Sequence, residues 1–366
     1  MRLCGYEQFS YLANCGQISF DAVPLESVSE DVLRDADAVV FVRGDDSFEV
    51  SLAKKLKRAG KYLVYVLDDD LLNIPGYISS ADYYHRNYVM RNISELMSLC
   101  DCLLTPSQRL AQKYGDKFQQ VILIEEPALT YAESVQRNAP VKVGFAGSID
   151  RALDFEQILA EPLRRVKAQL GDQVSIEFFG AKPDVADELG CKWYPYTESY
   201  EEYQQTMKKL EWDIGRAPMP DTEFHACKHY NKFIEYGSYG IISVCSDHVP
   251  YTRVVKNWEN GVLCQNTTQA WTDALVQLIT ASQTREQIRT QLCREIKEDF
   301  QVPEVSMRLW SQLDACITKL ERYTIGSLGG IRMKRVFAKL IQAACTYRWK
   351  LPVIVVKKAA KKLLAK

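Results

Sequence analysis

Lys228, Lys232 and Glu235 are spaced so that one α-helix would place their side chains within a narrow arc. Two lysines one turn apart repel each other, so a negative group is expected between them. The N-terminus of such a helix suits a diphosphate, because its free N–H groups and dipole add to the two cations. A carboxylate one turn further on can accept hydrogen bonds from a ribose diol. The pattern predicts a sugar-nucleotide site, and the alternative is a surface helix with an i,i+3 Lys–Glu pair.

The elements that would position these residues follow a regular alternation. Short apolar runs alternate with helical patterns, which predicts parallel sheets with helices on their faces. A polar stretch at 130–140 interrupts the alternation and is interpreted as a linker. Strands are expected within residues 36–44, 61–70, 101–107 and 120–127 before the linker, and within 141–147, 174–180, 212–219, 241–246 and 261–265 after it.

Two such α/β units predict two tandem Rossmann-like domains, at residues 1–135 and 136–302. An amphipathic helix at 303–323 and a basic tail at 324–366 complete the expected organisation. A chain of 366 residues is long enough for two hydrophobic cores. Ligands of open α/β sheets bind beyond the carboxyl ends of the strands, so two facing sheets predict a ligand cleft between the domains.

Residues 212–279 resemble the donor-binding half of GT-B glycosyltransferases similar to glycosyltransferase family four. The resemblance rests on an aspartate-led strand (WDIGRAPM), then KHYNKFIEYGSYGIISV, a Ser-Asp pair and an Asn-Gly turn, in that order. The segment VGFAGSIDRALDF resembles the first strand and turn of the same domain. VYVLDDDLLNIP and LCDCLLTPSQRLAQKY resemble strand ends of the first domain in these relatives.

The resemblance implies an α/β protein of the GT-B fold, whose two Rossmann-like domains face an interdomain cleft. It implies an enzyme of the hexosyltransferase class that takes a sugar from a nucleotide-diphospho-sugar and retains its anomeric configuration. The expected acceptor is a lipid-linked or cell-surface glycan, as in polysaccharide biosynthesis. No cofactor or metal is expected, because fixed cations and helix dipoles can stabilise the leaving diphosphate.

The resemblance also implies roles for individual residues. Glu235 matches a glutamate that contacts the nucleotide ribose, and Lys228 and Lys232 match basic positions for which we infer phosphate contact. Asp69 completes the expected catalytic set at the cleft edge, on the acceptor side. Cys227 stands where relatives have a glutamate that touches the transferred sugar. The expected donor-binding residues are Gly147, Ser148, Arg151, Asp221, Asn231, Lys228, Lys232 and Glu235.

Several of these features have alternative interpretations. The aspartates at 68–70 could hold a metal or cap a helix. His225 and His229 have the i,i+4 spacing of a metal-binding helix, although nearby lysines would repel a cation. Arg216 could reach the cleft or pair with an acid. A GT-B-fold sugar-nucleotide epimerase is one alternative function, and a non-catalytic partner subunit, favoured by Cys227, is the other.

The basic tail predicts a partner of its own. Eleven of the 46 Lys and Arg residues lie in residues 323–366, which contain no acidic residue. An anionic membrane surface attracts such cations, whereas core packing does not need them. A domain-packing helix and nucleic-acid binding are the alternatives, and we expect no nucleic-acid partner. The apolar stripe expected among these cations consists of Met333, Val336, Phe337, Leu340, Ala344 and Tyr347.

Composition bears on the compartment. The 11 cysteines are an odd number without the spacing of a zinc site, which indicates free thiols in a reducing environment. The first twenty residues lack the apolar core of a signal peptide, and no run is long and apolar enough to span a membrane. We expect a cytoplasmic protein that attaches peripherally to the inner face of a membrane through residues 332–366.

Overall fold

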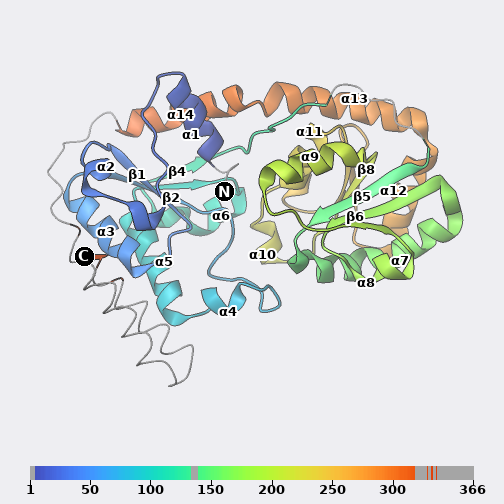
Figure 1. Cartoon of the computed structure of the whole chain (residues 1–366), viewed down its shortest axis with the longest axis horizontal. Helices are drawn as coiled ribbons and strands as arrows, with labels where there is room; N and C mark the ends of the chain where they lie inside the picture. Colours follow the sequence, from blue (N-terminus) through green and yellow to red (C-terminus); the bar gives the residue numbers. More distant parts are fainter. Residues whose placement is uncertain (1–4, 133–138, 318–327, 329–330, 333–334, 336–366) are drawn as a thin grey trace.

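The computed structural model describes residues 5–132, 139–317, 328, 331–332 and 335. Two β-sheets lie side by side, and helices cover both faces of each (Figure 1). The strand pairs run parallel throughout both sheets. This is the α/β architecture of two Rossmann-like units that the alternating sequence pattern predicts.

The first sheet has the strand order β1-β2-β3-β4. Its elements are α1 (Glu7–Asn14), η2 (Leu25–Ser27), α2 (Glu30–Arg34), β1 (Ala38–Val42), α3 (Ser47–Arg58), β2 (Tyr62–Val66), α4 (Ala81–Tyr84), α5 (Asn87–Leu99), β3 (Cys102–Thr105), α6 (Gln108–Tyr114), η3 (Gly115–Lys117) and β4 (Gln120–Leu123). Successive residues of β2 alternate between two apolar clusters, since side chains of a strand point to opposite faces. α3 and α5 contribute Leu56 and Ile93 to one cluster, and the helix at 302–317 contributes Leu309 and Leu313 to the other.

The second sheet has the order β10-β9-β8-β5-β6-β7. Its elements are β5 (Val141–Gly147), η4 (Ile149–Arg151), α7 (Ala152–Leu170), η5 (Gly171–Gln173), β6 (Val174–Gly180), α8 (Asp184–Glu188), β7 (Lys192–Tyr194), α9 (Tyr200–Leu210), β8 (Ile214–Ala217), α10 (Glu223–Ala226), α11 (Asn231–Ser238), β9 (Ile242–Ser246), η6 (Tyr251–Arg253), β10 (Val262–Cys264), α12 (Thr268–Thr280) and α13 (Ser282–Asp299). α7 and α12 cover one face, and α9 and α11 the other. The nine strands predicted from the sequence are all present; β7, a short edge strand, was not predicted.

The helix expected to carry the site is interrupted. α10 ends at Ala226 and α11 begins only at Asn231, so Lys228 lies in the connection between them. Tyr230 has φ −85° and ψ 36°, which lies outside the helical region. The expectation that Lys228 shares a helical arc with Lys232 is therefore wrong. The end of the helix follows the prediction, because Gly240 turns the chain into β9 with φ 65°.

The chain crosses between the two sheets twice. Residues 124–132 lead out of the first sheet, and α14 (Val302–Ile317) returns to it from the end of α13 (Figure 1). The two crossings touch, because the Ala128 N–H donates to the Phe300 carbonyl at 2.8 Å and Ala128 forms a bridge with Gln301. The final amphipathic helix that the sequence predicts thus packs on α1 and β4 of the first sheet.

The described residues of the tail lie against the first sheet's helices. Leu328 is buried, and its N–H donates to the Glu30 carboxylate at 2.5 Å. Arg335 forms ion pairs with Glu26 at 3.1 Å and Asp46 at 3.2 Å, so the expectation of cations without acidic partners is wrong for this residue. The predicted apolar stripe, from 333 to 347, lies outside the described residues. Within the described part, we find no helix with the length and apolar character needed to cross a bilayer.

Candidate functional site

Two glycines end neighbouring strands at the carboxyl edge of the second sheet. Gly147 of β5 pairs with Gly180 of β6. A Cβ atom on Gly180 would lie 2.4 Å from the Gly147 carbonyl oxygen, and the φ of 84° already favours glycine. A Cβ on Gly147 would lie 2.8 Å from the Phe145 ring. Both glycines are therefore required by close packing of the chain at the edge where ligands of parallel sheets bind.

Ser148 and Arg151 follow this edge, Ser148 just before η4 and Arg151 at its end. The Arg151 guanidinium lies 3.4 Å from a carboxylate oxygen of Asp154, whose side chain is buried. Asp154 also accepts a hydrogen bond from the Tyr77 hydroxyl at 3.1 Å and lies 3.4 Å from His225 Nε2. Burial would raise the pKa of Asp154, but contact with His225 and the charges of His225 and Arg151 lower it. Arg151 thus reaches the edge with a carboxylate beside it.

Lys228 connects the second sheet to the first. Its Nζ lies 2.7 Å from Asp69 Oδ1, across the two domains, and 4.4 Å from the centre of the Phe224 ring. Burial lowers the pKa of Lys228 despite the raising effect of Asp69, and the charges of Arg151 and Arg43 lower it further. Three cations, two from the second sheet and one from the first, therefore lie close enough to influence one another.

The flanking aspartates of the 68–70 run have cations from their own domain. Asp68 accepts two hydrogen bonds from Arg43, at 2.5 and 2.7 Å. Asp70 is fully buried and accepts from Lys113 at 2.6 Å and from the Tyr114 hydroxyl at 2.5 Å. The run is thus a set of ion pairs. In the part of the chain that the structure describes, no three His, Cys, Asp or Glu side chains gather in a way that could hold a metal ion.

α11 carries the other two residues of the predicted arc. Lys232 Nζ lies 2.5 Å from Glu235 Oε2, which is the i,i+3 pair of the alternative interpretation. Both side chains are largely buried, however, so this is not an ordinary surface pair. Burial, followed by the charge of the nearby Glu235 carboxylate, raises the pKa of Tyr203 well above its usual value. Lys228 and Lys232 thus contact different carboxylates instead of sharing one anion.

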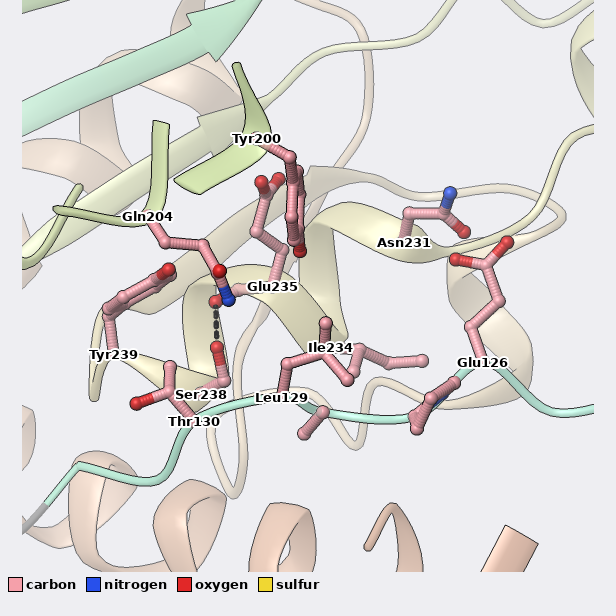
Figure 2. Close-up of a pocket in the computed structure, with 12 residues that line it drawn as sticks. Glu126, Leu129, Thr130, Tyr200, Gln204, Asn231, Ile234, Glu235, Ser238 and Tyr239 are labelled. Atoms are coloured by element: carbon pink, nitrogen blue, oxygen red, sulfur yellow. Dashed lines mark hydrogen bonds between the residues drawn. The ribbon is translucent and has the colours of Figure 1, made fainter. Parts of the chain in front are cut away.

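A small pocket of about 20 Å³ lies beside α11 (Figure 2). Its walls come from residues 126–130, which follow β4, and from α9 and α11. They mix aromatic, amide, hydroxyl and carboxylate groups. The Ser238 hydroxyl donates to the Glu235 backbone carbonyl at 2.7 Å, as the dashed line in Figure 2 shows. The lining residues are Glu126, Pro127, Ala128, Leu129, Thr130, Tyr200, Gln204, Asn231, Ile234, Glu235, Ser238 and Tyr239.

The remaining donor candidates divide between this pocket and the surface. Asn231 begins α11, lines the pocket and contacts His229 through its side-chain oxygen. Asp221 is exposed in the loop between β8 and α10. The sequence interpretation missed Tyr200, Gln204 and Gly180. Only the glycine carried a usable signal, since it ends an apolar run just as Gly147 does.

The two histidines of the i,i+4 pair face different acidic groups. His225 Nδ1 lies 2.7 Å from the Thr222 hydroxyl oxygen, and Nε2 of the same ring faces the buried carboxylate after η4. His229 is enclosed near the linker, 3.8 Å from Glu125 and 4.0 Å from Glu126. Because α10 ends between them, the two rings do not share a helix face. Their arrangement is that of two separate polar contacts.

Arg216 occupies neither of the positions considered from the sequence. Its guanidinium is fully buried and lies over the rings of Phe155 and Phe178, at 5.1 and 4.7 Å. Burial lowers the pKa of Arg216 to about 10. The carbonyls that accept its hydrogen bonds, at 2.8 to 3.1 Å, are those of Val143, Gly144 and Glu177. Arg216 therefore ties strands of the second sheet together.

Cys227, the residue before Lys228, is fully buried. Its sulfur lies 4.0 Å from Asp70 Oδ2, and burial, followed by the Asp70 charge, raises the pKa of Cys227 to about 12. The thiol is therefore neutral near pH 7 and brings no negative charge to the site. A glutamate here would have faced that aspartate, which lies fully buried.

Comparison with solved structures identifies the fold. TarM, known from Staphylococcus aureus, superposes with a TM-score of 0.58 at 14% identity, over 79% of this chain and 57% of TarM. HepE from Anabaena, solved with UDP and glucose, gives 0.57 at 15% identity, over 84% of this chain and 89% of HepE. The pneumococcal O-GlcNAc transferase GtfA, solved with UDP and GlcNAc, gives 0.56 at 14% identity, over 79% and 59%.

The chain covers different shares of the length of these neighbours. The chain spans little more than half the length of TarM and GtfA, although it spans most of HepE. No protein-family model matches the sequence, and no curated protein matches it. The structural likeness is nevertheless consistent across these neighbours and covers both sheets. The chain has the GT-B fold of these glycosyltransferases.

Proposed function

We propose that the protein is a glycosyltransferase that uses a nucleotide-diphospho-sugar, of the hexosyltransferase class and related to glycosyltransferase family four. The observation that carries the proposal is the pocket beside Glu235, with Lys228 and Arg151 near the strand edge of the same sheet. HepE, GtfA and TarM were each solved with UDP, which makes UDP the first ligand to test.

The polar and aromatic groups around the pocket suit the nucleoside part of such a donor. The Glu235 carboxylate is held by Lys232, and it can accept hydrogen bonds from a ribose diol. Tyr200 offers an aromatic ring in the same wall, and Gln204 offers an amide that can donate and accept. The residues of one helix face and of the linker thus supply the mixed polar and aromatic lining typical of small-molecule sites.

The cations suit the diphosphate. Negative charge develops on the leaving diphosphate as the sugar is transferred, and fixed positive groups in a partly buried site stabilise it. Lys228 is 15% exposed and Arg151 28% exposed in their side chains, so both charges act in surroundings of reduced polarity.

The acceptor side and the domain assignment belong to the same proposal. Residues 1–135 would form the acceptor-side domain and 136–302 the donor domain, with Asp69 at the edge that faces the sugar. The proposed acceptor is a lipid-linked or cell-surface glycan, and the proposed outcome is retention of anomeric configuration.

We also propose that residues 332–366 bind anionic membranes. In that case, removing residues 336–366 abolishes sedimentation with phosphatidylserine vesicles but leaves UDP binding unchanged.

A second candidate is a non-catalytic GT-B subunit, and one observation favours it. Cys227, a neutral buried thiol, stands where the resemblance implies a glutamate on the transferred sugar. A protein of this kind would bind a sugar nucleotide without transferring its sugar. Incubation with radiolabelled UDP-sugars separates the candidates, since only the transferase releases UDP and labelled product.

The binding proposal is tested by calorimetry with UDP and with uridine. Glu235→Gln removes the charge but keeps the volume, and loss of one charge-assisted hydrogen bond, about 1.5–3 kcal/mol, weakens both ligands roughly 10- to 150-fold. Lys228→Met weakens the binding of UDP but leaves the binding of uridine unchanged. Glu161→Gln is the matched control, because it breaks a helical ion pair with Arg164 and Arg165 on α7, away from the pocket. Equal affinity of wild type and Glu235→Gln for both ligands would contradict the proposal.

A further inference from the structure

Asp69 differs from its two neighbours in where its cation comes from. Asp68 and Asp70 pair with Arg43 and Lys113 of their own domain. Asp69 instead bonds to Lys228 of the other domain at 2.7 Å, with Arg43 Nη2 4.0 Å away. One carboxylate, 25% exposed in its side chain, therefore lies between cations from both domains.

Arg43 is held in an unusual backbone conformation to reach this position. It follows β1 with φ of 50°, which non-glycine residues rarely adopt, and its N–H donates to the Val66 carbonyl at 3.0 Å. Its side chain remains 35% exposed although its Nε and Nη2 both donate to Asp68. A guanidinium has five N–H donors, so Arg43 can keep Asp68 and still donate to a second anion.

We propose that Asp69 occupies the place of the donor's diphosphate between Lys228 and Arg43, and that the diphosphate displaces it on binding. This inference rests on the proposed function and adds Arg43, from the first domain, to the donor site. A diphosphate carries more negative charge than one carboxylate and more acceptor oxygens, so the exchange is electrostatically favourable. The exchange also breaks the ion pair that joins Asp69 to the second domain.

The proposal predicts that removing a carboxylate tightens ligand binding. Asp69→Asn frees Lys228 and should strengthen UDP binding about tenfold, the effect of one charge-assisted contact. Arg43→Gln should weaken UDP about tenfold and leave uridine unchanged. Asp69→Ser is the second variant if the asparagine form does not fold, and thermal unfolding shows which variants are folded.

Glu223→Gln is the control for a change in the position of the domains alone. Glu223 forms a two-point ion pair with Arg109 of the first domain, at 2.8 and 2.9 Å, and both side chains are about half exposed. This variant also breaks an interdomain ion pair but frees no cation of the proposed site. It should leave UDP affinity unchanged, whereas tightening equal to that of Asp69→Asn would attribute the effect to domain loosening and overturn the proposal.

The outcomes separate this inference from the function on which it rests. If wild type binds UDP and Asp69→Asn binds it equally or more weakly, the exchange is refuted and the proposed function stands. If no variant and no wild-type protein binds UDP or inorganic pyrophosphate, both are refuted. Tightening of UDP and pyrophosphate, but not of uridine, in Asp69→Asn supports the exchange.

Discussion

Replacing His229 with glutamine should destabilise the protein much more at pH 5.5 than at pH 8.5. His229 is buried in the connection between α10 and α11, and its two ring nitrogens lie 3.8 Å from Glu125 and 4.0 Å from Glu126. Tyr230 donates to Glu125 at 2.6 Å, and Arg308 of α14 acts on the same carboxylate. The imidazolium therefore connects the segment after β4 to the second domain.

The sign of the pH dependence follows from the two pKa shifts. Burial would lower the pKa of His229, but Glu125 and Glu126 raise it above its usual 6.5. Its stabilisation is therefore complete below about 6.5 and is lost as the pH rises through the folded-state pKa. Burial would raise the pKa of Glu125, but His229 lowers it below 4.5, so its contribution is lost only in acid. The pair stabilises the fold most between about pH 4.5 and 6.5.

The magnitude follows from leaving buried carboxylates without a cation. Removing one partner of a buried ion pair costs about 3–5 kcal/mol, and the smaller figure applies here because the Glu125 side chain is 30% exposed. As the pH rises and the His229 ring becomes neutral, the cost of the substitution should fall toward about 1 kcal/mol, for the lost hydrogen bond.

The assay is urea unfolding of wild type and variant at both pH values, followed by tryptophan fluorescence. His85→Gln is the control, since His85 is exposed and its Nε2 lies 2.8 Å from the Ile74 carbonyl oxygen. It should shift the unfolding midpoint equally at both pH values. An equal loss of stability for His229→Gln at pH 5.5 and 8.5 would refute the charged pair.

Gly180→Ala should lower the unfolding temperature more than Gly190→Ala. Both glycines have positive φ, but only at Gly180 would the new Cβ meet the Gly147 carbonyl, at 2.4 Å. This contact should add a cost of about 1–3 kcal/mol. Arg216→Met should destabilise by about 3 kcal/mol, because three buried carbonyls lose their donor, while UDP affinity of the folded variant stays unchanged; weaker UDP binding would return Arg216 to the site. Sugar transfer should survive EDTA, because Lys228 and Arg151 supply fixed charge; full loss with EDTA, restored by Mg²⁺ or Mn²⁺, would contradict this.

The parts of the fold that depend on local patterns could be predicted from the sequence. Apolar runs such as 141–147 and 241–246 form strands where expected, because burial on both faces requires such runs whatever their neighbours. β7 was missed because an exposed edge strand of three residues carries no such pattern. The last helix was predicted, but its packing on the first sheet depends on contacts between distant segments.

The site shows the same division. The position of Glu235 on a helix could be predicted from its spacing, because α11 is regular there. The break in the helix before Asn231 could not be predicted from the sequence. It depends on contacts of His229 with the carboxylates after β4, more than 100 residues earlier in the chain. Arg216 follows the same rule, because a buried arginine and a cleft arginine look alike until the facing carbonyls are placed.

The return of α14 to the first sheet has a consequence for how the chain folds during synthesis. Leu309 and Leu313 cover the same face of the first sheet as Phe9, so this layer combines segments about 300 residues apart. While the ribosome makes the second domain, the apolar face formed by β2 and β3 has no α14 to cover it. The first domain can therefore complete its core only after α14 emerges, and a fragment that ends after β4 would expose that face and tend to aggregate. The second domain, whose strands and covering helices all lie within residues 139–300, can fold before it.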